Sequence, residues 1–216
     1  MLIGHYAPAF ALQRARPSLP LWVLFIAVQA VDVLWGVFVL AGVEHVRIVP
    51  GFSESNALDL YYMPYSHSLA ATVVWALVFG LAWTAFRGWR EGVVIGVAVA
   101  SHFVTDLLVH LPDLPIAAGN GPKIGLGLWR WRWLALAVEA GLFVGAALWW
   151  WRARGGSRFL VLIGVMTVVL VASFFVPTPP TPQAMAATGL GTYALLAGAA
   201  AWNERARSRS QAPFRA

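Results

Sequence analysis

A regular series of possible metal ligands occurs within residues 101–110. His102, Asp106 and His110 recur there at intervals of four residues. On an α-helix this spacing places all three on one face, with neighbouring Cβ atoms about 6 Å apart, which allows two of them to bind one ion. His102 and His110 would lie about 12 Å apart along the helix axis, too far to share an ion bound through short side chains. Asp106 is therefore expected to pair with either histidine or to bridge two ions.

Other ionisable residues lie singly in apolar stretches, namely Asp32, His67 and Glu139. An ionisable side chain in hydrocarbon costs about 2.5 to 3.5 kcal/mol on insertion scales, so each of them needs a partner or a function. The chain has no cysteine, and histidines with carboxylates form a nitrogen and oxygen ligand set suited to Zn²⁺, Mn²⁺ or Fe²⁺. Interhelical hydrogen bonds, ion pairs or a proton relay would produce the same composition, and both interpretations stay open.

The composition predicts that these residues belong to a membrane protein. Of the 216 residues, 60% are hydrophobic and only 11% charged, whereas about a quarter are charged in a soluble domain. Six stretches reach the roughly 20 apolar residues that a membrane crossing needs: 19–43, 68–86, 92–111, 133–151, 159–176 and 184–202. The predicted fold class is all-α, a polytopic membrane helix bundle with six transmembrane helices. The bundle would comprise residues 1–203, followed by a basic disordered cytoplasmic tail at 204–216.

The arginines and lysines predict the topology. Eleven of them lie before the first stretch, between the second and third, between the fourth and fifth, and after the sixth. On the other side are four, namely Arg47, Lys123, Arg130 and Arg132. The positive-inside rule then places both termini in the cytoplasm. Topology accounts for the net charge of +6, and no nucleic-acid partner is expected. The last three of those four are expected to be interfacial residues, with phosphate binding as the alternative.

Residues 3–13 form an apolar segment too short to cross the membrane. As a helix it would be about 16 Å long, and Arg14 and Arg16 would hold its end at the cytoplasmic surface. We expect a short N-terminal half-membrane helix that brings His5 near mid-depth. Asp32 should lie at a similar depth on the adjacent helix.

Two further motifs concern how the later helices pack and connect. Gly141 and Gly145 form a GxxxG pattern, which predicts that a neighbouring helix approaches closely there. The proline-rich segment 178–182 predicts a stiff extended connector. The two stretches on either side of this connector contain no charged residue. Such a surface is compatible with packing against partner membrane subunits.

Five short motifs follow one another in the first half of the chain: Gly4-His5, Asp32, Ser66-His67-Ser68-Leu69, Ser101-His102-x-x-x-Asp106 and Leu114-Pro115. Their order and spacing, from residue 4 to about residue 115, resemble a bacterial inner-membrane family of metal-dependent hydrolases, some of which are described as LexA-binding. The resemblance implies a distant relation to helical zinc-dependent phospholipases C. It also implies a divalent metal site built from His5, Asp32, His67, His102 and Asp106.

Two positions depart from that family's pattern. Members often have an Asp-x-Asp-His run where this chain reads Asp32-Val33-Leu34-Trp35, and a histidine where it has Tyr62. A centre with two metal ions would then need Asp59, His110 or Glu139 as a substitute ligand. A single-metal or metal-free descendant of the family is the alternative.

The predicted function is hydrolysis of a lipid or polyprenyl phosphoester at the outer leaflet of the bacterial inner membrane. Zn²⁺ is the expected cofactor, because it lowers the pKa of its bound water towards 7. His110 or Glu139 would act as general acid or base. Two alternatives stay open, an ion- or proton-coupled transporter and a non-catalytic subunit of a larger membrane complex.

Overall fold

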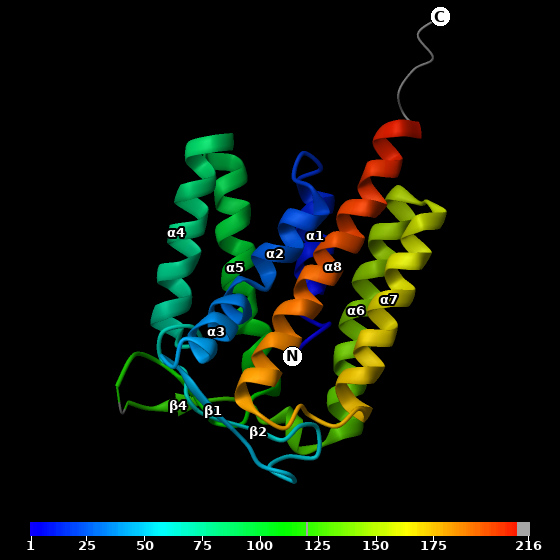
Figure 1. The fold of residues 1–216 in the computed structure, drawn as a ribbon. Helices are drawn as coiled ribbons and strands as arrows, with labels where there is room; N and C mark the ends of the chain where they lie inside the picture. The colour runs from blue at the N-terminus through cyan, green and yellow to red at the C-terminus, as the bar shows by residue number, and fades with distance from the viewer. Residues whose placement is uncertain (120, 211–216) are drawn as a thin grey trace, which may run out of the picture.

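The computed structural model describes residues 1–119 and 121–210, and most of these are helical (Figure 1). The helices are α1 Tyr6–Ala15, α2 Leu21–Val28, α3 Ala30–Leu40, α4 Leu69–Arg87, α5 Trp89–Val109, α6 Arg132–Arg154, α7 Ser157–Phe175 and α8 Pro182–Ser210. Two antiparallel hairpins pair β1 (His45–Ile48) with β2 (Leu58–Tyr62) and β3 (Leu114–Pro115) with β4 (Lys123–Ile124), and a 3-10 turn, η1, covers Leu128–Arg130. The all-α prediction is wrong in these connections, where extended backbone satisfies its hydrogen-bonding groups by pairing with itself.

Five helices, α4 to α8, are long and apolar enough to cross a membrane. They coincide with five of the predicted stretches to within a few residues at most ends. The main exception is the last helix, which continues to Ser210. Residues 204–210 are therefore helical where an irregular tail was predicted, and the rest of that tail, 211–216, lies outside the described residues.

The first predicted span, 19–43, consists of two helices instead of one. α2 and α3 meet at Gln29 at an angle of 53°, where the backbone has φ −102° and ψ 5°. The buried side chain of Gln29 donates from Nε2 to the carbonyl oxygen of Leu2, at 3.2 Å. The last carbonyls of a helix lack helical partners, and here the carbonyl of Val28 accepts a hydrogen bond from Nδ1 of His102, at 2.8 Å. The break therefore provides an acceptor for a histidine of α5.

The predicted short N-terminal helix is α1. Its side chains Tyr6 and Phe10 are buried against Phe25 of α2, with ring centroids 4.4 and 5.5 Å apart. Near its other end, Nη1 of Arg14 donates to the carbonyl oxygen of Trp149 on α6, at 2.5 Å. The N-cap residue of α1 is His5, so this packing holds His5 inside the bundle.

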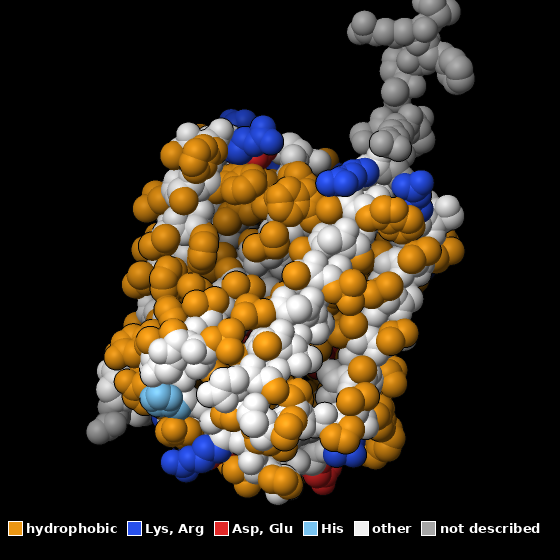
Figure 2. Space-filling model, in the orientation of Figure 1, with side chains coloured by type: hydrophobic (Ala, Val, Ile, Leu, Met, Phe, Trp, Pro, Cys, Tyr) orange, Lys and Arg blue, Asp and Glu red, His pale blue; other side chains and the backbone are white. Residues whose placement is uncertain are grey.

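The connections between helices gather at two ends of the molecule (Figure 1). The α4–α5 and α6–α7 connections and the end of α8 lie at one end, and both hairpins lie at the other, which we call the hairpin end. The space-filling view shows basic side chains at both ends and a largely apolar surface between them (Figure 2). Segments predicted to share one side of the membrane therefore share one end of the molecule.

Glycines allow α4 and α5 to pack with their backbones in close contact. A Cβ atom added at Gly80 would lie 3.0 Å from the carbonyl oxygen of Gly92, and one added at Gly92 would lie 2.5 Å from that of Gly80. The predicted close approach at Gly141 and Gly145 is wrong, because a Cβ atom at either position would have nothing within 4 Å. These two glycines face open space on α6.

Candidate metal centre

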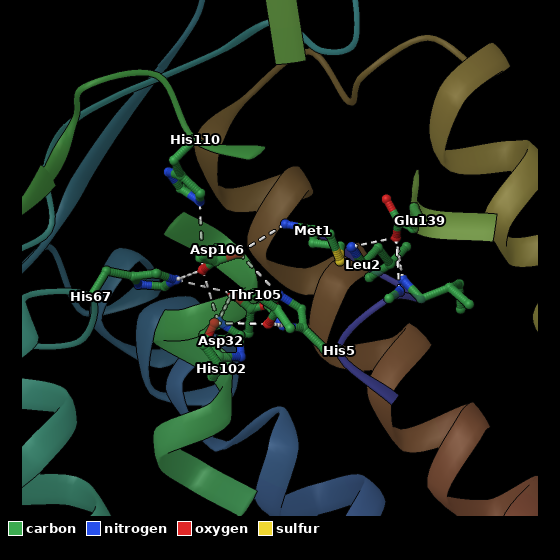
Figure 3. Close-up of polar contacts among 12 residues, drawn as sticks. Met1, Leu2, His5, Asp32, His67, His102, Thr105, Asp106, His110 and Glu139 are labelled. Atoms are coloured by element: carbon green, nitrogen blue, oxygen red, sulfur yellow. Dashed lines mark hydrogen bonds and ion pairs between the residues drawn. The ribbon is translucent and has the colours of Figure 1, made fainter. Parts of the chain in front are cut away.

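Histidines and aspartates from separate segments converge inside the bundle near the hairpin end (Figure 3). His5 caps α1, Asp32 lies in the first turn of α3, His67 precedes α4, and α5 contributes His102 and Asp106. Asp32 is half-buried and the other four are buried. The five residues predicted as metal ligands thus lie together, and their binding of a metal stays a prediction.

The carboxylate of Asp106 lies at the middle of this cluster. Its Oδ1 is 3.0 Å from Nε2 of His5. Its Oδ2 is 3.1 Å from Nε2 of His102 and 3.6 Å from Nε2 of His67. The same Oδ2 is 3.5 Å from Nε2 of His110. One carboxylate therefore faces the Nε2 atoms of four imidazole rings.

Asp32 on α3 provides a second carboxylate. Its Oδ1 lies 3.2 Å from Nε2 of His67 and 3.6 Å from Nε2 of His102. Its Oδ2 accepts a hydrogen bond from the hydroxyl of Tyr193 on α8, at 2.8 Å. The potential ligand atoms form two groups in which all atoms lie within 4.8 Å of one another: His5, His102 and Asp106, and Asp32, His67 and His102.

The Nδ1 atoms on the other side of these rings are held by acceptors. Nδ1 of His102 donates to the carbonyl oxygen of Val28, a group that can only accept. Nδ1 of His110 lies 2.8 Å from a carboxylate oxygen of Asp113. These partners select the form of each ring in which Nδ1 carries the proton, so that Nε2 of the neutral ring has a lone pair.

Two hydroxyl groups do the same for the remaining histidines. Oγ of Ser66 donates its proton to Oε2 of the buried Glu44. Oγ itself therefore accepts a hydrogen bond from Nδ1 of His67, at 2.8 Å. Oγ1 of Thr105 donates to a carbonyl of its own helix, at 2.9 Å, and accepts from Nδ1 of His5. Each of the four Nδ1 atoms therefore has a hydrogen-bond partner on the outer side of the cluster.

The consequence is a concentration of electron pairs in the middle of the cluster. Four Nε2 atoms face two carboxylates, and Nε2 of His5 and of His102 are nearest, at 3.0 and 3.1 Å from the oxygens of Asp106. Buried groups of this kind need a proton or a metal cation between them. Rings whose Nδ1 is held by an acceptor while Nε2 points inward are typical of metal-ligating histidines. The residues therefore fit a divalent cation that prefers nitrogen and oxygen ligands.

His110 differs from the other histidines because it belongs to neither of the two groups. Burial disfavours its charged form, but the carboxylates of Asp106 and Asp113 favour that form more strongly, so the pKa of His110 is raised above its ordinary value. Its ring packs against Trp129, with centroids 4.3 Å apart. His110 therefore lies beside the two groups without belonging to either. The expectation that His102 and His110 do not share an ion agrees with this arrangement.

Glu139 contacts the N-terminal segment and not the histidines (Figure 3). Its Oε1 accepts hydrogen bonds from three consecutive backbone N–H groups, those of Leu2, Ile3 and Gly4. The amino group of Met1 then lies 2.9 Å from Oδ1 of Asp106. α6 thereby positions the segment that carries His5. A role of Glu139 as general acid or base stays a prediction.

The other candidate residues lie at the hairpin end, Asp59 and Lys123 in strands and Arg132 at the start of α6. Asp59 is a strand residue of β2 that pairs with Arg47, at 3.6 Å. Lys123 donates from Nζ to the carbonyl oxygen of Tyr61, at 2.9 Å. Arg132 donates from Nε to the carbonyl oxygen of Glu54. These contacts stabilise the hairpin end.

A cavity of about 340 Å³ connects the cluster to α7 and α8, within the usual size range of ligand pockets. Asp32, His67, Asp106 and His110 form part of its wall. α7, α8 and their connector contribute mainly apolar and hydroxyl-bearing residues. Among the described residues that line the cavity, none is lysine or arginine. The structure therefore gives no support to phosphate binding by the basic residues of the hairpin end.

Several residues that hold the cluster were not identified from the sequence, and Tyr193 and Glu44 are two of them. Tyr193 is a polar side chain within an apolar span, and buried tyrosine hydroxyls usually find a partner, so this signal was present. Glu44 reaches the cluster only through Ser66, and its position in a connection carries no comparable signal. Both residues hold a member of the cluster in place.

The chain is mostly helical, with five helices able to cross a membrane and a further bent pair. It contains a buried cluster of histidines and aspartates that could bind a metal ion. Comparisons of the chain with known protein families, with curated proteins and with solved structures found no match.

Proposed function

We propose that this protein is a membrane-embedded, metal-dependent hydrolase of a lipid or polyprenyl phosphoester. The observation that carries the proposal is the convergence of four Nε2 atoms on two carboxylates, with every Nδ1 held from outside. The resemblance of residues 4–115 to bacterial inner-membrane hydrolases supports the same function. With the eleven basic residues in the cytoplasm, the cluster would lie in the outer half of the bacterial inner membrane.

His5, His102 and Asp106, together with Asp32 and His67, would hold the metal ion. Their nitrogen and oxygen atoms suit Zn²⁺. When bound, Zn²⁺ polarises a phosphoryl oxygen and lowers the pKa of a bound water towards 7. The acceptors on the Nδ1 atoms would keep each ring in the orientation that binding requires.

His110 is the side chain best placed to move a proton. It lines the cavity, and its Nδ1 is held by Asp113 at 2.8 Å. A histidine oriented in this way by a carboxylate is suited to general acid or base catalysis. In the proposal, Nε2 of His110 takes a proton from the attacking water or returns it to the leaving oxygen. Glu139 serves mainly to anchor the N-terminal segment, because Oε1 already accepts three hydrogen bonds.

The test uses the full chain reconstituted in phosphatidylcholine vesicles and loaded with Zn²⁺. Bound metal is measured by elemental analysis, and turnover is measured with a lipid phosphoester and with a soluble chromogenic phosphodiester. We expect His110→Asn to retain the metal and to lower kcat by about a hundredfold or more, the usual size of an acid–base contribution. His45→Asn is the matched control, because His45 is exposed on β1. A wild-type protein that binds no metal and hydrolyses neither substrate would contradict the proposal and favour a structural subunit or a transporter.

A further inference from the structure

The cavity beside the histidine cluster opens sideways between α7 and α8. Towards the hairpin end its wall includes three buried residues, Ser55, Leu60 and Trp129. Its exposed lining residues on the other side are Ser173 of α7, Thr188 of α8, and Val176 and Pro177 of the connector. Because α7 and α8 are apolar enough to span a membrane, this opening faces the lipid.

The wall of the cavity is polar at the cluster and apolar farther away. Tyr193 of α8 touches Asp32 through its hydroxyl. Met185, another lining residue of α8, lies eight residues earlier and therefore about 12 Å away along the helix. Facing residues of α7 include Val169 and Ala172. The cavity thus continues from the cluster along an apolar wall long enough to hold part of an aliphatic chain.

The charges in the cavity limit which ligand can use it. The described lining residues include Asp32, Asp106 and Glu139 but no arginine or lysine side chain. A ligand with several anionic groups would find no basic side chain along the wall. A ligand with one small anionic head could place that head at the cluster while its chain lies against α7 and α8. This combination is the chemistry of an amphipathic phosphoester.

We propose that the space between α7 and α8 is a binding site for one aliphatic chain of a lipid phosphoester, which reaches the cluster directly from the bilayer. The identity of the head group rests on the proposed function, whereas the chain site rests on the cavity and its lateral opening. A chain that moves from bilayer to protein stays in apolar surroundings, so the site binds through close packing and not through removal of the chain from water. A side chain that fills this space should therefore exclude the ligand.

The test is photo-crosslinking of the full chain in phosphatidylcholine vesicles with an alkyl phosphate that carries a diazirine near the end of its chain. We compare the wild type with Ala172→Phe, which fills the cavity from α7. Ala187→Phe is the matched control, since Ala187 is exposed on α8 and does not line the cavity. Crosslinked residues are mapped by mass spectrometry, and unlabelled hexadecyl phosphate and inorganic phosphate serve as competitors.

We expect saturable crosslinks at lining residues of α7 and α8 that hexadecyl phosphate displaces. Ala172→Phe should weaken this binding by about tenfold, and Ala187→Phe should leave it unchanged. Labelling that does not saturate, or that is equal in both variants, would overturn the chain site. Displacement of the probe by inorganic phosphate as effectively as by hexadecyl phosphate would also overturn it, since the chain would then add nothing. Saturable labelling without any turnover would instead overturn the hydrolase while retaining the lipid site.

Discussion

Two pairs of neighbouring helices, α4–α5 and α7–α8, have similar apolar composition but pack in opposite ways. α4 and α5 are in backbone contact at Gly80 and Gly92, where an added Cβ atom would collide with the facing carbonyl. α7 and α8 separate around a cavity. Residues 176–181 connect α7 to α8, and the prolines in this connector cannot continue α7.

The difference in packing matches two requirements of the site, which are to hold the ligands and to leave space for a substrate. The closely packed pair includes α5, which carries His102 and Asp106, and small displacements of such ligands would weaken any metal site. The open pair contributes space and one hydrogen bond, from Tyr193 to Asp32. Rigid packing thus holds the ligands, and loose packing leaves room for a substrate.

The largest effect should come from Asp106→Asn, which removes the charge that four imidazoles share. Loss of this ligand should lower metal affinity in a binding titration by more than the ten- to hundredfold that partners of a ligand contribute. The control is Asp59→Asn on β2, whose carboxylate pairs with the exposed Arg47. Equal metal affinity in both variants would show that α5 does not hold the metal.

The second effect concerns the same glycine replacement in the two helix pairs. Gly92→Ala should lower the free energy of unfolding by about 1 to 3 kcal/mol, because overpacking forces the helices apart. Gly164→Ala on α7 places its Cβ in open space, and alanine favours a helix over glycine by up to about 1 kcal/mol. Unfolding in mixed micelles should therefore show opposite signs. Two destabilised variants would mean that α7 is packed as closely as α5.

A smaller effect is expected from Ser66→Ala, which disconnects Glu44 from His67 while keeping the metal ligands. Metal affinity should fall by about tenfold, since partners that orient a ligand contribute at this level. Ser101→Ala serves as the control, because its hydroxyl donates to the carbonyl of Ala98 in the same helix. If Ser66→Ala and Ser101→Ala bind the metal equally well, the hydroxyl of Ser66 does not position His67.

The smallest effect should come from Tyr193→Phe on α8. Loss of its hydrogen bond to Asp32 should cost about 1 kcal/mol of metal binding, which competition with a chelator can measure. Tyr62→Phe is the control, since the Tyr62 hydroxyl lies 3.4 Å from that of the exposed Tyr65, away from the cluster. An effect of Tyr193→Phe larger than that of Ser66→Ala would contradict the division, because the open pair would then hold the ligands too.

Much of the site could be predicted because helical geometry is local. The spacing of His102, Asp106 and His110 puts them on one face of any helix, and the apolar length of the spans sets the depth of Asp32. The outer contacts of the rings could not be predicted, because Val28 and Glu44 reach the histidines through the tertiary fold. The hydrogen bonds of Glu139 could not be predicted for the same reason, since its carboxylate accepts from backbone groups 135 to 137 residues away in the chain.

The amino-acid sequence by itself determined the apolar lengths of the helices, the sides on which basic residues gather and the spacing of the ligands on α5. The tertiary structure decided what depends on a facing partner. Gly92 and Gly96 form the same GxxxG pattern as Gly141 and Gly145, yet only the first pair meets a neighbouring backbone. The bend at Gln29 likewise has no glycine or proline beside it that would predict a break. A local pattern permits a contact or a break, but the free energy that selects it comes from residues distant in the chain.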